Sequence, residues 1–213
     1  MVDGFEFTAL TFPRDGAVLD ALDISVGATE SVALFGPNGG GKSSLLRVIA
    51  GTAPRTEPRA EVAYLPQIPY LFRGAVASNL TLGLDEEESD QARRLAEEFA
   101  VARLLGKPSD EISVGETQRV CLARTLASSA PLVLLDEPLS PINAASRMEI
   151  GSIITRCTSG RALLWATHSL REVRAFADRL IVLDDGVILQ EGPVEQVLNS
   201  PVDARVASIF GSP

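Results

Sequence analysis

The chain contains the stretch Gly36-Pro37-Asn38-Gly39-Gly40-Gly41-Lys42-Ser43, which fits the pattern G-x-x-x-x-G-K-[ST]. An apolar run, Ser31–Phe35, precedes it, and a helical pattern over Ser44–Ala50 follows. Between a strand and a helix, glycines let backbone N–H groups turn toward phosphate oxygens, and the helix adds its positive end. The stretch therefore predicts a nucleoside triphosphate site. The alternative is a glycine-rich turn that only caps an ordinary helix.

Each position of this phosphate loop has an expected role. The ammonium group of Lys42 would reach the β and γ phosphate oxygens, and the hydroxyl of Ser43 would ligate Mg²⁺. The other nucleotide-binding candidates, which act through the backbone, are Gly36, Pro37, Asn38, Gly39, Gly40, Gly41 and Ser44.

Composition limits the setting in which such a site would work. The 213 residues carry a net charge of −9, which argues against broad nucleic-acid binding. No apolar run reaches the ~18 residues that span a bilayer, so a soluble cytoplasmic protein is expected. Cys121 and Cys157 stand in apolar surroundings without metal-ligand spacing, which predicts reduced, buried thiols.

Seven apolar or β-rich runs predict strands, and several do not alternate with polar residues, as expected for strands buried on both faces. They are Phe5–Phe12, Ser31–Phe35, Glu61–Leu65, Leu132–Asp136, Ala162–Thr167, Arg179–Leu183 and Val187–Gln190. We expect a single α/β domain with a mainly parallel sheet, in which the first and last runs form antiparallel edge pieces.

A helical pattern interrupts the strands. An acidic start at Asp85–Glu88 leads into apolar residues at helical spacing, and the pattern continues to Gly106. We expect a solvated helix start here, with a partner-binding acidic segment as the alternative. We expect a short helical subdomain over about 70–128 around it.

The strand Leu132–Asp136 ends in two carboxylates, those of Asp136 and Glu137. A carboxylate at the end of a strand beside the phosphate loop can hold Mg²⁺, which gives Asp136 the Walker B role. The next carboxylate, Glu137, can act as general base toward an attacking water. Taken alone, Asp-Glu-Pro after a strand is also ordinary turn chemistry.

A third motif is Ile112-Ser113-Val114-Gly115-Glu116-Thr117-Gln118-Arg119. It resembles the signature L-S-G-G-Q/E-x-Q-R of the ATP-binding cassette (ABC) family, which lies just upstream of the Walker B strand. Ser113 and Glu116 also form a plain helix capping box, and the two interpretations are compatible. The resemblance implies that this helix start, with Ser113, Gly115 and Glu116, faces the γ-phosphate of ATP held by a second ATPase subunit.

Other elements of the ABC pattern follow in order. Gln67 resembles the Q-loop glutamine that senses Mg²⁺ and the transmembrane partner, and His168 resembles the switch histidine that contacts the γ-phosphate. The run Ser140–Asn143 occupies the place of the D-loop. Phe12 resembles the aromatic residue that stacks on adenine, although a core phenylalanine fits equally. A lone histidine such as His168 is also often structural.

Three positions depart from the family pattern. Val114 replaces the first signature glycine, Thr117 replaces a frequent glutamine, and Asn143 stands where the D-loop usually carries aspartate. None of these is a predicted catalytic residue; those are Lys42, Glu137 and His168. Hydrolysis should survive, while the rate and the coupling of the two subunits are open.

The resemblance covers Phe5 to Gly192 and implies the ATPase subunit of an ABC membrane transporter. Such a subunit works on the inner face of the membrane, with transmembrane permease chains and, in importers, sometimes a solute-binding protein. Two subunits, identical or different, would enclose two ATP molecules with Mg²⁺. A soluble ABC ATPase of DNA repair or translation is an alternative, and so is a P-loop kinase or GTPase, which the Ser113 motif opposes.

Two segments bear on direction and docking. The tail from Glu191 to Gly211 resembles importer ATPases for oxyanions, whereas Pro69–Gly74 resembles exporter cassettes, so import is preferred and export stays open. Tyr70, Leu71 and Phe72 suit an exposed loop that docks a permease, with burial in the helical subdomain as the alternative.

Overall fold

The computed structural model describes residues 4–12, 21–53 and 60–211, and within these ranges six strands form a central sheet in the order β4-β5-β6-β3-β7-β8. Neighbouring strands run parallel, except that β8 is antiparallel to β7. The elements are β1 (Phe5–Leu10), β2 (Leu22–Val26), β3 (Ser31–Phe35), α1 (Lys42–Ile49), β4 (Val62–Leu65), α2 (Val76–Leu80), α3 (Glu86–Glu98), η1 (Ala102–Leu104), η2 (Ser109–Glu111), α4 (Val114–Ala127), β5 (Leu132–Asp136), α5 (Arg147–Cys157), β6 (Ala162–Ala166), α6 (Leu170–Phe176), β7 (Arg179–Asp184), β8 (Val187–Pro193), α7 (Val194–Asn199) and α8 (Ala204–Ile209).

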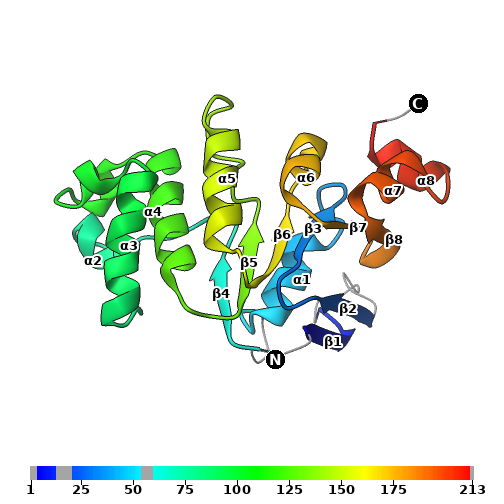
Figure 1. Ribbon diagram of the computed structural model, residues 1–213, viewed down its shortest axis with the longest axis horizontal. Helices are drawn as coiled ribbons and strands as arrows, with labels where there is room; N and C mark the ends of the chain where they lie inside the picture. The colour runs from blue at the N-terminus through cyan, green and yellow to red at the C-terminus, as the bar shows by residue number, and fades with distance from the viewer. Residues whose placement is uncertain (1–3, 13–20, 54–59, 212–213) are drawn as a thin grey trace.

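The central strands are apolar throughout because both faces of the sheet are covered. On β3, Val32 and Leu34 belong to the core that contains α1 and the β1–β2 pair, whereas Ala33 and Phe35 belong to the core on the opposite face. Helices α4 and α5 pack on that opposite face (Figure 1). This arrangement confirms the expected α/β class with a mainly parallel sheet and an antiparallel edge.

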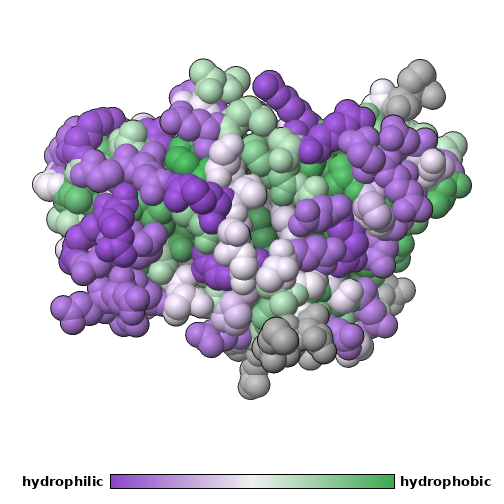
Figure 2. Space-filling model, viewed as in Figure 1, coloured by the Kyte–Doolittle hydropathy of each residue, from purple (hydrophilic) through white to green (hydrophobic). Residues whose placement is uncertain are grey.

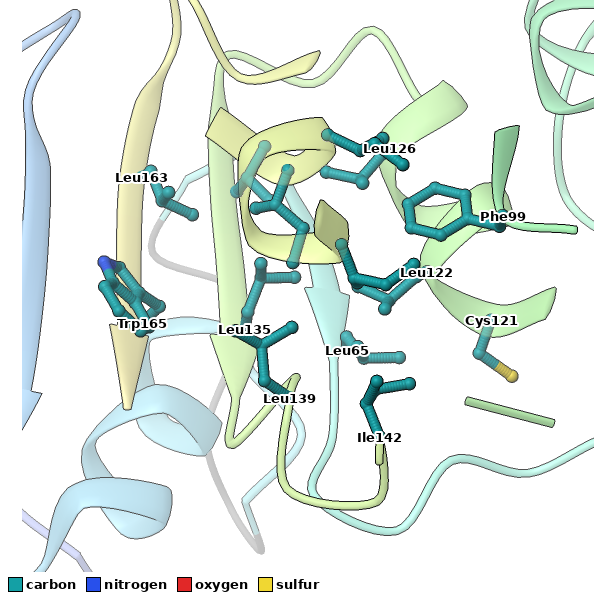
Figure 3. Packing of buried hydrophobic residues seen from close by; sticks show 14 of the residues in the cluster. Leu65, Phe99, Cys121, Leu122, Leu126, Leu135, Leu139, Ile142, Leu163 and Trp165 are labelled. Carbon is teal, nitrogen blue, oxygen red and sulfur yellow. The ribbon is translucent and has the colours of Figure 1, made fainter. Parts of the chain in front are cut away.

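The larger core joins the helical part of the chain to the sheet. Figure 3 shows Leu135 of β5 and Trp165 of β6 on the same side of the sheet as Leu122 of α4 and Phe99, which follows α3. Each of these side chains is at most 3% exposed. Packing therefore fixes α4 relative to β5, the strand that ends in Asp136.

The predicted helix Asp85–Gly106 is too long. Its start is right, because Asp85 caps α3 and forms a capping box with Glu88. Its end is wrong, because α3 stops at Glu98 and Ala100 takes the left-handed conformation with φ 54°. The N–H of Val101 then donates to the carbonyl of Ala96 at 2.8 Å, which closes a Schellman turn. Glycine usually occupies the left-handed position of this turn, so the alanine in the sequence did not indicate that the helix ends here.

Strand β2 was missed by the analysis of apolar runs. It pairs antiparallel with β1, beside the main sheet, and its residues alternate between buried and exposed. Such alternation is expected for a strand with one face on the core and the other exposed to solvent. The first predicted strand, β1, thus pairs with β2, which the search for apolar runs did not predict.

Hydrophilic side chains gather over the helical end of the molecule around α3 (Figure 2). Helices α2, α3 and α4 lie together at that end (Figure 1). A separate helical subdomain over about 70–128 remains a prediction. No helix in the described part of the chain has the length and apolar character needed to cross a membrane.

Candidate nucleotide site

The site residues follow the carboxyl ends of three neighbouring strands. Strand β6 lies between β3 and β5, and all three run parallel. The phosphate loop follows β3, Glu137 follows β5, and His168 comes two residues after β6. Parallel strands end at one edge of a sheet, so segments about 130 residues apart meet there.

The phosphate loop turns tightly before α1. Gly41 precedes the helix with φ 108°, a conformation that side chains other than glycine rarely adopt. The Nζ atom of Lys42 donates to the carbonyl oxygens of Gly36 and Pro37 at 2.8 and 2.9 Å. Because an ammonium group has three protons, Lys42 keeps one donor for a phosphate oxygen.

Lys42 lies in a strongly charged setting. Burial lowers the pKa of its ammonium group, and the carboxylates of Glu137, Asp136 and Asp184 act in the opposite direction. These negative charges favour the ammonium form that phosphate binding needs.

Asp136 and Ser43 form a pair of oxygen donors. The Ser43 hydroxyl donates to Oδ1 of Asp136 at 3.0 Å, while Oδ2 is buried without a hydrogen-bond partner among the described residues. Burial raises the pKa of Asp136, and the neighbouring charge of Glu137 raises it further. An unpartnered carboxylate oxygen beside a hydroxyl fits Mg²⁺, which prefers oxygen ligands. The donor set therefore suits the predicted metal.

Glu137 is held in an uncommon backbone conformation. Its φ is +48°, the left-handed region, which costs a side-chain-bearing residue on the order of 1–3 kcal/mol. Its N–H donates to the carbonyl of Ala166 at the end of β6 at 3.0 Å, which fixes this turn. The Oε2 atom lies 3.4 Å from Nδ1 of His168. The carboxylate and the imidazole are thus close enough to act together.

The turn that carries His168 is ordered by polar contacts. The Thr167 hydroxyl donates to Oε2 of Glu172 at 2.6 Å, and the Ser169 side chain accepts the N–H of Glu172 at the start of α6. The His168 side chain itself is 53% exposed. It is therefore accessible to a ligand, and its catalytic role remains a prediction.

A cavity of about 280 Å³ lies over the phosphate loop, just below the size of ordinary small-molecule pockets. Its lining comes from the loop, from Gln67 after β4 and from Glu137 after β5. The lining residues are Asn38, Gly39, Gly41, Lys42, Ser43, Ser44, Gln67 and Glu137. Phe12 is not part of this lining; it is half-buried against the core of β1, β2 and α1. Its adenine-stacking role remains a prediction.

The signature segment lies apart from this cavity. Ser113 caps α4 by accepting the N–H of Glu116, and the Glu116 carboxylate accepts the N–H of Ser113. The N–H and the hydroxyl of Ser113 both donate to this carboxylate at 3.0 Å, and together with Arg103 they lower the pKa of Glu116 to about 2. A Cβ at Gly115 would come within 3.3 Å of the Pro141 carbonyl oxygen. The helix start is therefore rigid and lies against the D-loop segment.

Gln118 is a site residue that sequence reasoning left without a role. Its side chain is fully buried, and Nε2 donates to the carbonyl of Pro138 at 2.8 Å. This bond ties α4 to the turn directly after Glu137. The available signal was that the residues one helical turn further on, Cys121 and Leu122, are apolar.

A family model described as "ABC transporter" matches residues 19–140. The chain belongs to the ABC transporter family. This confirms the resemblance found in the sequence and the ATP-binding cassette fold that it implied. The ABC domain is 35% identical to the maltose/maltodextrin import ATP-binding protein MalK of Escherichia coli K12, over 90% of this chain and 58% of that protein. It is 32% identical to MalK of Salmonella paratyphi A, over 93% and 60%.

Solved structures agree with this assignment. A bacterial Atm1-family ABC exporter with ATP bound has a TM-score of 0.82 and 25% identity, over 97% of this chain and 41% of that chain. An ATP-binding subunit of an ABC transporter has a TM-score of 0.83 over 97% of both chains at 22% identity, which shows the fold alone. The ABC domain thus spans about 58–60% of the MalK relatives.

Proposed function

We propose that this chain is the ATP-binding and ATP-hydrolysing subunit of an ABC membrane transporter, on the inner face of the cell membrane, and that it energises import. The observation that carries the proposal is the meeting of Lys42, Asp136, Glu137 and His168 at one edge of the sheet. The matched MalK proteins, named for import, support the direction.

The residues divide the work of hydrolysis. Lys42 and the loop N–H groups bind the phosphates, and Glu137 takes a proton from the attacking water, with His168 orienting its carboxylate. Ser43 and Asp136, with Gln67 nearby, would hold Mg²⁺, which supplies positive charge against the phosphate oxygens.

No residue of the signature helix α4 is among the described residues that line the cavity of the same chain. This supports a head-to-tail dimer, in which α4 would face the nucleotide of a second ATPase subunit, identical or different. Val114 is 71% exposed at the start of α4, where that partner's nucleotide would lie. Asn143 is exposed too, and its Oδ1 accepts the N–H of Ser146 at 3.0 Å. An aspartate would keep this local bond and add the missing charge.

We expect the isolated chain to be mostly monomeric and a slow ATPase. The pair Val114→Gly and Asn143→Asp should raise its ATPase rate about 3–10-fold, because the branched side chain leaves the interface and a charge returns. Phosphate release by the purified chain is the measurement. Single variants separate the two positions, and an unchanged or lower rate for the pair would show that neither limits turnover.

The loop after Gln67 offers a surface for permease subunits. Ile68, Tyr70 and Phe72 are 84%, 66% and 58% exposed. The rings of Tyr70 and Phe72 meet edge to face at 5.2 Å. Leu71 differs, since it packs partly buried against the main core, so the predicted exposure is wrong for Leu71 and the docking surface is assigned to its neighbours.

Hydrogen bonds hold the backbone of this loop at Phe72. Asn79 is buried, and its side-chain amide accepts the N–H of Phe72 at 2.7 Å and donates to the carbonyl of Phe72 at 2.9 Å. The Ser109 hydroxyl donates to the same carbonyl at 2.9 Å. Exposed aromatic rings on a fixed loop suit a short amphipathic helix of a permease.

We expect Phe72→Asp to prevent co-purification with the permease subunits of the transporter, while ATP binding by the chain alone stays within about twofold of wild type. A charge on the apolar surface opposes docking, whereas the backbone bonds of Phe72 remain. Val202→Asp, at a residue 63% exposed elsewhere, is the control. Retained co-purification, or loss of ATP binding, would contradict the docking role.

Export is the second candidate, favoured by the likeness to the Atm1-family exporter. The substrate class is also open: the tail suggests oxyanions, whereas the matched relatives are named for maltose and maltodextrin. ATP-driven uptake by inside-out vesicles would indicate export. Dependence of transport on a solute-binding protein would support import.

A further inference from the structure

The turn between β7 and β8 lies directly against the phosphate loop. The N–H of Gly186 in this turn donates to the carbonyl of Gly40 at 3.1 Å. A Cβ on Gly40 would lie 3.0 Å from the carbonyl oxygen of Leu183 and 3.3 Å from Cα of Asp184. A Cβ on Gly36 would lie 1.9 Å from that same Leu183 oxygen. The end of β7 therefore packs against the phosphate loop. Only glycine at positions 36 and 40 leaves room for the backbone of β7 to come this close.

Arg205 of α8 holds this turn. Its Nε and Nη2 atoms lie 3.0 and 2.7 Å from Oδ2 of Asp184, and Nη2 also lies 2.9 Å from Oδ2 of Asp185. The helix that carries Arg205 is itself anchored, because Asp203 caps it and Val206 is fully buried. One side chain thus fastens the C-terminal helix to the turn behind the phosphate loop.

A second contact joins the same C-terminal segment to the other end of the loop. The ring of Phe210 lies 5.9 Å from the ring of Phe35. Phe35 is the last residue of β3 and immediately precedes Gly36. Helix α8, at one end of the molecule in Figure 1, is therefore connected to the start of the loop and to the turn behind its middle.

The Asp184 carboxylate also has an electrostatic effect on the site. Its charge acts on Lys42, the side chain expected to bind the β and γ phosphates. A carboxylate close enough to affect Lys42 also repels the triphosphate that Lys42 would bind, unless a cation offsets its charge. Arg205 is that cation, and the Asp184 side chain is 17% exposed, so water screens their interaction only in part.

We propose that α8 positions the phosphate loop and that Arg205 is a positioning residue for ATP binding, holding the Asp184–Asp185 turn in place and neutralising Asp184. The inference rests on the proposed ATP site and deepens it, because it connects affinity for ATP to the C-terminal segment. The affinity of the site for ATP would therefore change when α8 moves.

We expect Arg205→Ala to raise the Kd for Mg-ATP about 3–5-fold at low salt, and less at 0.5 M salt, where charges are screened. In the assembled transporter KM should rise while kcat stays within about twofold, because Glu137 and His168 are untouched. Calorimetric titration of the purified chain with Mg-ATP is the main measurement, and thermal unfolding checks that the variant folds.

A charge rescue separates neutralisation from a merely structural role. In the double variant Asp184→Asn with Arg205→Ala the charge of Asp184, which acts on Lys42, is removed, so the Kd should return to within about twofold of wild type. Asp185 also loses Arg205, but its side chain is 84% exposed, so water screens its charge. Arg174→Ala is the matched control, because it breaks another exposed ion pair, with Glu195 at 3.7 Å, and neither residue lines the cavity.

The outcomes are distinct. If wild type and Arg205→Ala bind Mg-ATP equally at low salt, the role of Arg205 is overturned and the ATP site stands. If the double variant binds as weakly as Arg205→Ala, neutralisation of Asp184 is overturned and the ATP site stands. If wild type does not bind Mg-ATP, both proposals fall.

Discussion

Lys42→Ala is expected to lower ATP hydrolysis by the purified transporter complex at least about 100-fold, because it removes the charge that meets the β and γ phosphates. Lys42 is 6% exposed, and Nζ is already oriented by the carbonyls of Gly36 and Pro37. A flexible surface lysine or a solvent cation cannot replace a donor held in this way. Phosphate release at saturating ATP is the measurement.

Lys107→Ala is the control for this prediction. Lys107 is the other lysine of the chain and is exposed, so the same change in composition there should leave hydrolysis unchanged. Thermal unfolding must show that the Lys42 variant folds, since two loop carbonyls lose their donor. Hydrolysis by folded Lys42→Ala within twofold of wild type would rule out the assigned phosphate loop.

The sequence allowed the sheet and the site to be predicted because both depend on local patterns. Apolar runs without alternation correspond to strands covered on both faces, and Leu132–Asp136 agrees with β5 residue for residue. The carboxyl ends of parallel strands then bring Lys42, Asp136, Glu137 and His168 together without further information.

The sequence-based predictions are wrong where tertiary contacts determine the local structure. Ala100 ends α3 in a conformation that alanine does not signal, and Leu71 turns inward between two exposed aromatic residues. Gln118 and Arg205 contact backbone or carboxylate partners 20 and 21 residues away. Such partners follow no local spacing rule, so only the folded chain identifies them.

Glu137→Gln is expected to leave ATP binding intact and to lower turnover about 10²–10⁴-fold, because an amide cannot accept the proton of the attacking water. Glutamine matches glutamate in size, so the left-handed backbone at this position, with φ 48°, and the N–H bond to Ala166 need not change. The amide also keeps a polar atom beside His168, which lies 3.4 Å from the carboxylate. A loss of turnover with unchanged Kd for Mg-ATP would therefore report chemistry rather than folding.

The same variant tests the dimer. With hydrolysis blocked, the closed state that ATP favours should persist, and size-exclusion chromatography with ATP and Mg²⁺ should show more dimer than for wild type. Glu195→Gln, which alters an exposed carboxylate away from the cavity, should elute like wild type. Because Val114 is exposed where two subunits would meet, combining Glu137→Gln with Val114→Gly should increase the dimer fraction further. Dimer in the absence of ATP, or none under any ATP condition, would contradict enclosure of ATP between two subunits.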